Sequence, residues 1–342
     1  MKDEEKNKDK RDKMDNRNEI DKDEIKNALD DAKLSDNISF DEGRFLRKAK
    51  WISTLRTVAI SLIVAAAFLI LAVVVTQELL SRQEWRISDI YPSIIRYSTP
   101  NTIAIEGDSY DTGFIGRRKN FYLFRMVGKK PIAVGTTITD FQVWGGEQFW
   151  NPSRSTIKTE DGREYLLPNM VPALKFFHPA AKYDEFYDKP PREFDLLANV
   201  PENSTVEMAV SFSHLLSREE MKALLPAGVE PMWGAITAYS DKEIEKKNYL
   251  ADRLVGIPLG GFVNGEHELS DEEFIQELDT LSKIPSHSSR ALSRTASFLR
   301  QNGVKFYGVV VVGKPEALLK LADNPTISAA VMGAVEWQGM IR

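Results

Sequence analysis

The residues best suited to chemistry do not form a catalytic motif. Gly308–Pro315 reads G-x-x-x-x-G-K-P, but Pro315 stands where a phosphate-binding loop needs a hydroxyl for Mg²⁺. The four residues between the glycines are all valine, which predicts a buried strand. Ser155–Lys158 spells S-x-x-K without the other motifs of that class of serine enzymes. We therefore predict no catalytic residues and no enzyme.

Metal and redox chemistry also lack a sequence signal. The chain has no cysteine, which excludes disulfides, cysteine-ligated zinc, iron–sulfur clusters and a thiol nucleophile. The spacings between successive histidines are 36, 53 and 20 residues, which match no local zinc pattern; the four are His178, His214, His267 and His287. We expect no metal and no cofactor.

Charge is distributed unevenly along the 342 residues. The net charge of −5 argues against a basic nucleic-acid binder, and no helix-turn-helix pattern is present, so we expect no direct binding to nucleic acid. Residues 1–40 contain 10 Lys/Arg and 13 Asp/Glu with a single aromatic residue. Such a segment buries too little apolar surface to offset its ordering entropy. We predict a disordered tail over residues 1–38.

An uncharged stretch follows at Thr57–Gln77. Its 21 residues would form a helix of about 32 Å, close to the thickness of the bilayer's hydrocarbon core. A buried core helix is seldom apolar on all sides over this length. A cleaved signal peptide normally has a short leader, whereas 56 residues precede this run. We interpret the stretch as a retained single-pass transmembrane helix in the cell membrane.

The flanking charges predict the orientation of this helix. Five cationic residues lie just before it: Arg44, Arg47, Lys48, Lys50 and Arg56. Only Arg82 and Arg86 follow closely. The positive-inside rule therefore places the N-terminus in the cytoplasm and residues 78–342 outside, with Trp51 and Trp85 toward the two interfaces. Membrane lipid is thus an expected partner.

The cytoplasmic segment carries a weak helical pattern. Ile25, Ala28, Leu29 and Ala32 share one helix face, and Ser39–Glu42 matches a capping box that would start a basic juxtamembrane helix over 39–56. One interpretation is a segment that folds on a cytosolic partner. Its candidate contacts are Ile25, Leu29, Phe40, Arg44, Phe45 and Arg47. The alternative is an inert, solvated tail beside anionic lipid.

Residues 78–201 predict a β-rich extracytoplasmic domain. The predicted strands are 102–106, 120–127, 132–143 and 164–167, after a short stalk at 87–97 that Pro92 interrupts. A long loop rich in proline and aromatic residues extends from 168 to 201. A ligand or partner surface could use the aromatic residues Trp144, Phe149, Trp150, Phe176 and Phe177. The alternative is that such side chains attach the loop to the domain.

Residues 202–342 predict an α/β domain. A strand at 206–212, a helix capped by Ser217–Glu220 and a strand at 232–239 are echoed by a strand at 304–312, a helix starting at Pro315 and a strand at 327–337. Two further helices are predicted, one capped by Ser270–Glu273 and one over 289–301. The fold class is thus α+β, with a split-βαβ, ferredoxin-like C-terminal domain.

Several stretches resemble the bacterial sigma-factor regulator family. They include Phe40–Trp51 before the span, Lys305–Gly313, and Ala334–Trp337. Ile90–Pro92 and Thr99–Asn101 also resemble the region of the family just outside the membrane. The resemblance implies an anti-sigma factor whose tail binds an extracytoplasmic-function sigma factor while the outer domain senses envelope state. The chain departs from many other anti-sigma factors in lacking their zinc-binding His/Cys module, so we expect a sigma contact without zinc. A second membrane protein is a further candidate partner.

The sequence is compatible with two other functions. The glycine and aromatic residues at 144–150 and 256–265 suit an anchored envelope enzyme or ligand-binding protein that acts through its outer domain. A structural anchor without a signalling role is the third interpretation.

Overall fold

The computed structural model describes residue 26 and residues 41–128, 130–150, 156–160, 162–183, 190–246, 254–260 and 268–337. The chain divides into two compact units, Met1–Ala72 and Val73–Arg342. The predicted disordered tail lies outside the described residues, apart from the single helical residue Lys26. The fold is mixed, with helices and several antiparallel sheets, as predicted.

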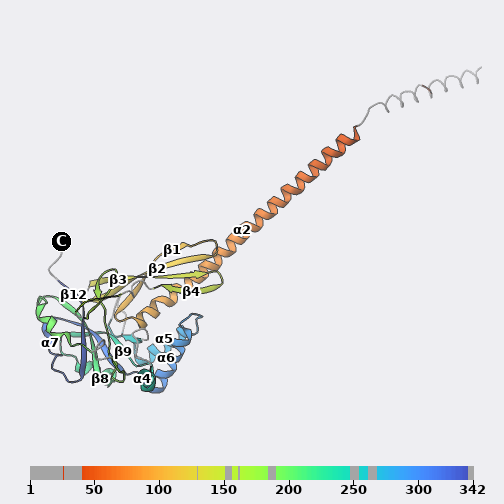
Figure 1. Cartoon of the computed structure of the whole chain (residues 1–342). Coiled ribbons are helices and arrows are strands. Elements are labelled where there is room, and N and C mark those ends of the chain that lie inside the picture. The colour runs from red at the N-terminus through yellow and green to blue at the C-terminus, as the bar shows by residue number, and fades with distance from the viewer. Residues whose placement is uncertain are drawn as a thin grey trace, which may run out of the picture. The chain divides into compact units, whose positions relative to one another are not determined.

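The uncharged stretch lies within helix α2, Glu42–Ser98 (Figure 1). Within the described ranges this is the one helix whose length and composition would let it cross a membrane. The helix begins directly after Asp41, whereas the predicted capping box would start it after Ser39. The side chain of Asp41 accepts a hydrogen bond from the backbone N–H of Arg44 at 3.0 Å. Ser39 lies outside the described residues.

The predicted interruption of the stalk at Pro92 is wrong, because α2 runs through this residue. A proline inside a helix costs roughly 3 kcal/mol. The turns around it bury Ile90, Tyr91 and Ile95, and each such side chain contributes about 1.5–3 kcal/mol. Tertiary burial therefore outweighs the local penalty.

The first sheet is an antiparallel meander in the order β1-β2-β3-β4. Its strands are β1 Thr102–Asp111, β2 Gly116–Val127, β3 Lys130–Gln142 and β4 Gly145–Trp150. A small second sheet contains β5 Thr156–Lys158, β6 Glu164–Leu166 and β7 Val171–Pro172. The four predicted strands match β1, β2, β3 and β6 in place, whereas β4, β5 and β7 carried no recognised signal.

The largest sheet has the order β10-β9-β11-β8-β12, and all its neighbouring strands are antiparallel. Its strands are β8 Thr205–Leu216, β9 Val229–Ile236, β10 Gly256–Pro258, β11 Phe306–Gly313 and β12 Ile327–Glu336. β8 and β9 enclose β11, and β11 and β12 enclose β8. The two β–helix–β segments are therefore interleaved.

The helices after α2 are η2 Glu193–Asn199, α3 Arg218–Leu224, α4 Asp241–Lys246, α5 Asp271–Ser282, α6 Ser289–Asn302 and α7 Pro315–Leu319. The helices α3, α5, α6 and α7 begin where local signals predict, whereas η2 and α4 carried no recognised signal. Both predicted capping boxes are present, at Ser217 and Ser270. α6 ends at Gly303, whose φ of 73° suits glycine.

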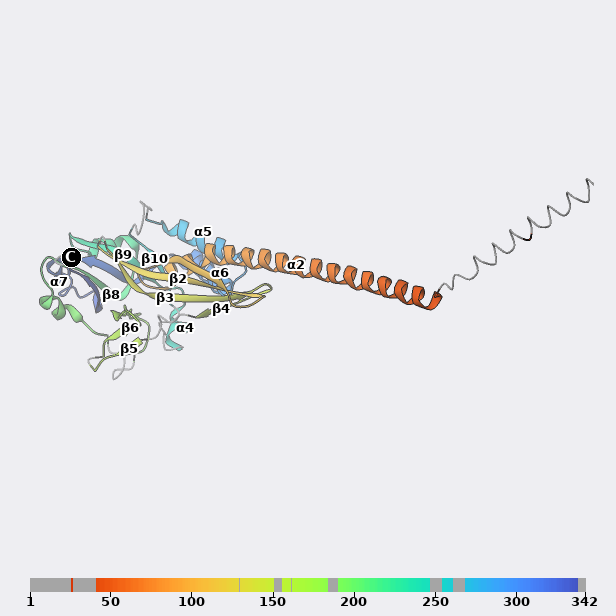
Figure 2. The same ribbon diagram turned by 90° about the horizontal axis from the view of Figure 1, so that it is seen from above.

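Two apolar clusters cover the two faces of the β8–β12 sheet. One contains side chains of α3, α5, α6 and α7, and the other contains side chains of the β1–β4 sheet. Figure 2 shows the same elements from above. The end of α2 contributes to both clusters, since Ile90 and Tyr97 belong to the first and Ile87 and Tyr91 to the second. The domain boundary predicted between residues 201 and 202 thus separates two sheets whose side chains pack in one apolar cluster.

A buried ion pair joins the two large sheets. Arg125 of β2 lies 3.4 Å from Glu207 of β8, and the two side chains are 2% and 0% exposed. Asn101 donates a hydrogen bond to Glu207 at 2.6 Å, and the backbone N–H of Ala334 donates to it at 3.2 Å. The Glu207 carboxylate therefore orders groups from three segments of the chain.

We expect Glu207→Ala to lower the free energy of unfolding by about 3–5 kcal/mol, because Arg125 would remain buried without its counter-charge. Urea denaturation of the full chain in detergent measures this. Glu202→Ala, at an exposed position, is the matched control. A loss below about 1 kcal/mol for Glu207→Ala would contradict the structural role assigned to the pair.

Candidate functional site

The candidate partner contacts before the uncharged stretch are only partly described. Arg44 pairs with Asp41 at 3.6 Å, and Arg47 donates a hydrogen bond to the carbonyl oxygen of Gly43 at 3.0 Å. Phe45 is exposed on the same first turns of α2. The other three candidates, Ile25, Leu29 and Phe40, lie outside the described residues.

The candidate outer aromatic residues do not share one environment. Trp144 is exposed in the turn between β3 and β4, whereas Phe177 is buried. Phe176 packs beside Trp233 and Tyr307, with ring centroids 5.8 and 6.3 Å apart. The side chains of Phe149 and Trp150 are not among those described. The placement of Phe176 and Phe177 favours the alternative in which aromatic side chains attach the loop to the domain.

The stretch that resembles a phosphate-binding loop is part of a strand. Gly308–Gly313 is a buried part of β11, as the valine run predicts, and Pro315 starts α7. Within the described ranges, no group of three or more His, Asp or Glu side chains is placed to hold a metal ion.

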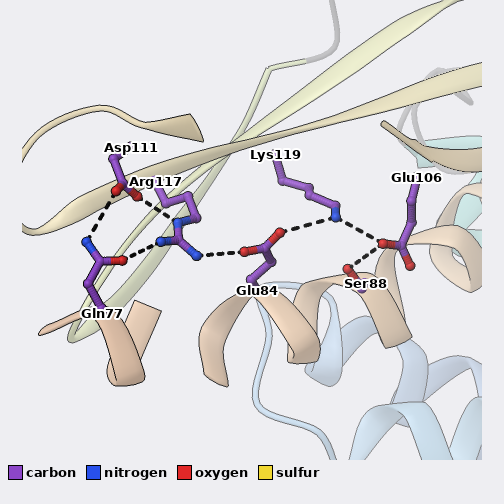
Figure 3. A network of polar contacts seen from close by, with 7 residues as sticks. All are labelled: Gln77, Glu84, Ser88, Glu106, Asp111, Arg117 and Lys119. Atoms are coloured by element: carbon purple, nitrogen blue, oxygen red, sulfur yellow. Dashed lines mark hydrogen bonds and ion pairs between the residues drawn. The ribbon is translucent and has the colours of Figure 1, made fainter. Parts of the chain in front are cut away.

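The structure instead reveals a polar contact between α2 and the hairpin of β1 and β2 (Figure 3). We call it the helix–hairpin clasp. It consists of Gln77, Glu84 and Ser88 on α2, Glu106 and Asp111 on β1, and Arg117 and Lys119 on β2. It begins at the last residue of the uncharged stretch.

Arg117 is the main hydrogen-bond donor of the clasp. Its Nη1 donates to Glu84 Oε2 at 2.8 Å, and its Nη2 donates to Gln77 Oε1 at 2.6 Å. Its Nε donates to Asp111 Oδ1 at 2.8 Å, while Gln77 Nε2 donates to Asp111 Oδ2 at 3.2 Å. One guanidinium thus joins two turns of α2 to the end of β1.

Lys119 makes the second connection. Its Nζ lies 3.3 Å from Glu84 Oε1 and 3.0 Å from Glu106 Oε2. Ser88 Oγ donates to the same Glu106 oxygen at 3.0 Å. The Lys119, Arg117 and Glu84 side chains are only 9%, 15% and 18% exposed, so solvent screens these charges less than it screens surface pairs.

The side-chain periodicities of α2 and β2 place the residues of the clasp on facing sides of the helix and the strand. Arg117 and Lys119 are two residues apart on β2, so they face the same side as Phe121, which is fully buried. Gln77, Glu84 and Tyr91 recur every seven residues on α2, which places them on one helix face. Tyr91 and Phe121 meet with ring centroids 4.7 Å apart. The polar clasp therefore continues into an apolar contact.

The charges of the clasp stabilise one another. Burial opposes ionisation of Glu84, but hydrogen bonds from Ser109, Arg117 and Lys119 outweigh it and hold the pKa of Glu84 below its usual value. The hydrogen bond from Arg117 is the main cause that lowers the pKa of Asp111. Burial would lower the pKa of Lys119, yet hydrogen bonds to Glu106 and Glu84 raise it. Glu84, Asp111 and Lys119 are therefore charged at neutral pH.

The clasp links the position of the β1–β2 hairpin to that of α2. A shift of the β1–β2 hairpin must either move α2 or break contacts to Glu84. Sequence analysis did not identify these residues. The available signals were the heptad spacing of Gln77, Glu84 and Tyr91 after the uncharged stretch and the alternation of Arg117 and Lys119.

We expect Glu84→Ala to lower the free energy of unfolding by about 1–3 kcal/mol, because Arg117 and Lys119 lose a shared, partly buried carboxylate. Chemical denaturation of the full chain measures this. Because the Glu84 pKa is lowered in the folded state, its contribution is present above the unfolded pKa of about 4.3 and is lost as pH falls through the folded pKa. The difference from wild type should therefore shrink in acid.

Glu78→Ala is the matched control on the same helix. Glu78 pairs with Arg82 at 2.8 Å, but both side chains are largely exposed, so we expect a loss of about 0.5 kcal/mol or less. Equal effects of the two substitutions would show that the clasp is no stronger than a surface ion pair.

Comparison with known proteins gives two regional matches. Residues 44–132 match the family model described as sigma factor regulator N-terminal, and residues 197–334 match the one described as sigma factor regulator C-terminal. The first region contains the whole clasp and the uncharged stretch of α2. The second contains the β8–β12 sheet almost completely.

A relative in Bacillus subtilis (strain 168) is described as the probable anti-sigma-M factor YhdL. It is 22% identical over 256 residues, which cover 71% of this chain and 66% of the relative, so the match spans slightly less than two thirds of that protein's length. No solved structure matches the chain. The two regional matches together cover about two thirds of the 342 residues, and the chain belongs to the sigma-factor regulator family.

Proposed function

We propose that the chain is a membrane-anchored anti-sigma factor. In this function residues 1–56 bind an extracytoplasmic-function sigma factor at the cytoplasmic face and keep it from RNA polymerase. The observation that carries the proposal is the presence of both family regions in one chain, the first of which contains the apolar helix, together with a relative described as a probable anti-sigma-M factor. Transcription from sigma-dependent promoters would therefore be repressed.

The proposed orientation has a cytoplasmic N-terminus and an extracytoplasmic Val73–Arg342 unit. Its support is the excess of Lys and Arg over Asp and Glu in residues 41–56, including Arg44 and Arg47 at the start of α2. The same cations would contact anionic lipid.

The proposed sigma-binding surface combines Ile25 and Leu29 with Phe40, Arg44, Phe45 and Arg47. Exposure of Phe45 near the start of α2 supports a role in binding, because this side chain is accessible to a partner. Apolar anchors flanked by cations suit a groove with an acidic rim.

We expect deletion of residues 1–38, or Phe45→Asp in the full chain, to raise transcription from the partner's promoter, because the sigma factor would be released. A reporter gene measures this, and immunoblotting of membranes verifies equal amounts of each variant. Lys26→Ala, at an exposed position, is the matched control. Unchanged expression after the deletion would overturn the anti-sigma function.

The orientation can be tested separately because the chain has no cysteine. We expect a membrane-impermeant maleimide to label Glu202→Cys on intact cells and to label Lys26→Cys only after lysis. The reverse pattern would show that the proposed topology is inverted. This result does not depend on whether a sigma factor binds.

The outer unit is proposed to sense envelope state, and a second membrane protein is a candidate partner in this step. The interleaved strand order of β8, β9, β11 and β12, with α3 and α7 as connections, supports classifying residues 202–342 as ferredoxin-like. The classification concerns architecture and carries no activity of its own.

An anchored ligand-binding protein is the alternative function. A cavity of about 620 Å³ lies beside the loop between α3 and β9 and the residues that follow β10. Lys222, Glu230, Met232, Leu259, Gly260 and Glu268 contribute to its wall. Its mixed charged and apolar lining suits a small polar envelope component. The transcription assay above discriminates between the two functions, because a ligand-binding protein without a sigma partner would leave the promoter unchanged.

A further inference from the structure

Two hairpin turns meet at one end of the β1–β4 sheet. The turn between β1 and β2 covers residues 112–115, and the turn between β3 and β4 contains Val143 and Trp144. The backbone N–H of Val143 donates a hydrogen bond to the carbonyl oxygen of Ile115 at 3.0 Å, so the turns are adjacent. We call them the paired tips.

The paired tips expose large apolar side chains. Phe114, Ile115 and Trp144 are 56%, 40% and 67% exposed. Single apolar side chains on a surface are ordinary, but three on adjacent turns form a local apolar surface.

The clasp determines the level of the paired tips along α2. Ser88 of α2 contacts Glu106 of β1. Gln77, which lies eleven residues before Ser88 on the helix, contacts Asp111, which lies five residues after Glu106 on the strand. Eleven helical residues span about 16 Å, and five strand residues span about the same. The helix and the strand are therefore antiparallel neighbours, and residues beyond Asp111 lie beside the turn of α2 that precedes Gln77.

That turn is the last part of the uncharged stretch. It contains Val73, Val74 and Val75, whose side chains are exposed. In Figures 1 and 2 the ends of both hairpins lie along α2, in agreement with the contacts of Gln77. The apolar tips are thus at the depth where the helix itself is still apolar.

The strand residues next to the paired tips carry polar side chains. Arg118 donates hydrogen bonds to Asp140 at 2.5 and 2.7 Å and lies near the hydroxyl of Tyr110. Arg117 and Lys119 belong to the clasp. An apolar tip followed by Tyr, Arg and Lys matches the sequence of environments from acyl chain to headgroup in a bilayer.

We propose that the paired tips insert into the outer interface of the bilayer, with Phe114, Ile115 and Trp144 among the lipids. The occupant of this apolar surface is therefore lipid, argued from its continuity with the span. The inference rests on the proposed membrane anchoring of α2. It gives the outer unit a second attachment to the membrane and thereby fixes its rotation about the helix axis.

The test uses the full, cysteine-free chain in phosphatidylcholine vesicles, with one introduced cysteine carrying a fluorophore. The vesicles contain lipids with a nitroxide quencher either near the glycerol end or in the middle of the acyl chains. Phe114→Cys reports on the tips, and Lys130→Cys, at the opposite end of the same sheet, is the matched control. Val64→Cys, inside the uncharged stretch, reports on the span alone.

We expect the shallow nitroxide to quench the label at Phe114→Cys at least about twofold more than at Lys130→Cys, because interfacial side chains lie ~5–10 Å into the boundary between headgroups and acyl chains. The control position is about 35 Å away along the strands. Trp144→Cys gives an independent report from the adjacent turn, should a label at position 114 disturb its own turn.

The outcomes separate this inference from the proposed function. Quenching at Val64→Cys without quenching at Phe114→Cys or Trp144→Cys would overturn the contact of the tips and leave the anchor intact. Absence of quenching at Val64→Cys would overturn the membrane span and the inference with it.

Discussion

The last turns of α2 carry apolar side chains on two faces, and both faces must be buried at once. Ile90 and Tyr97 enter the cluster beneath the helices, while Ile87 and Tyr91 enter the cluster between the sheets. The indole N–H of Trp233 also donates to the carbonyl oxygen of Arg96 at 2.8 Å. The segment after the uncharged stretch is therefore part of the core, and the two large sheets depend on it for complete coverage.

Nearer to the uncharged stretch, the same helix face changes from apolar to charged. Glu84 is held by two cations from one strand, so sliding α2 by one turn would separate the carboxylate from both. Apolar contacts tolerate small shifts, whereas these hydrogen bonds require particular atoms to meet. The clasp thus determines the register between α2 and the hairpin, while burial supplies most of the stabilisation.

In the proposed orientation, a signal from outside the cell would have to pass along the single helix α2. A ligand shifts an equilibrium only by its difference in affinity for two states. Because the end of α2 is part of the core, a second state requires breaking the clasp, rotating the whole Val73–Arg342 unit, or changing its association. Tips held in the bilayer interface would oppose rotation, which leaves the clasp and association as the steps that a stimulus would have to change.

Local signals in the sequence determined most of the elements. The capping boxes at Ser217 and Ser270, the glycine that ends α6 and the valine run of β11 depend on neighbours a few residues away, and the structure agrees with each. The uncharged stretch likewise determined a long apolar helix. Glu84 and Arg117 are 33 residues apart and have no joint local signature, so only strand pairing and helix packing bring them together. Continuity through Pro92 and the inward packing of Phe176 were also decided by tertiary structure, because burial summed over distant segments outweighs local preference.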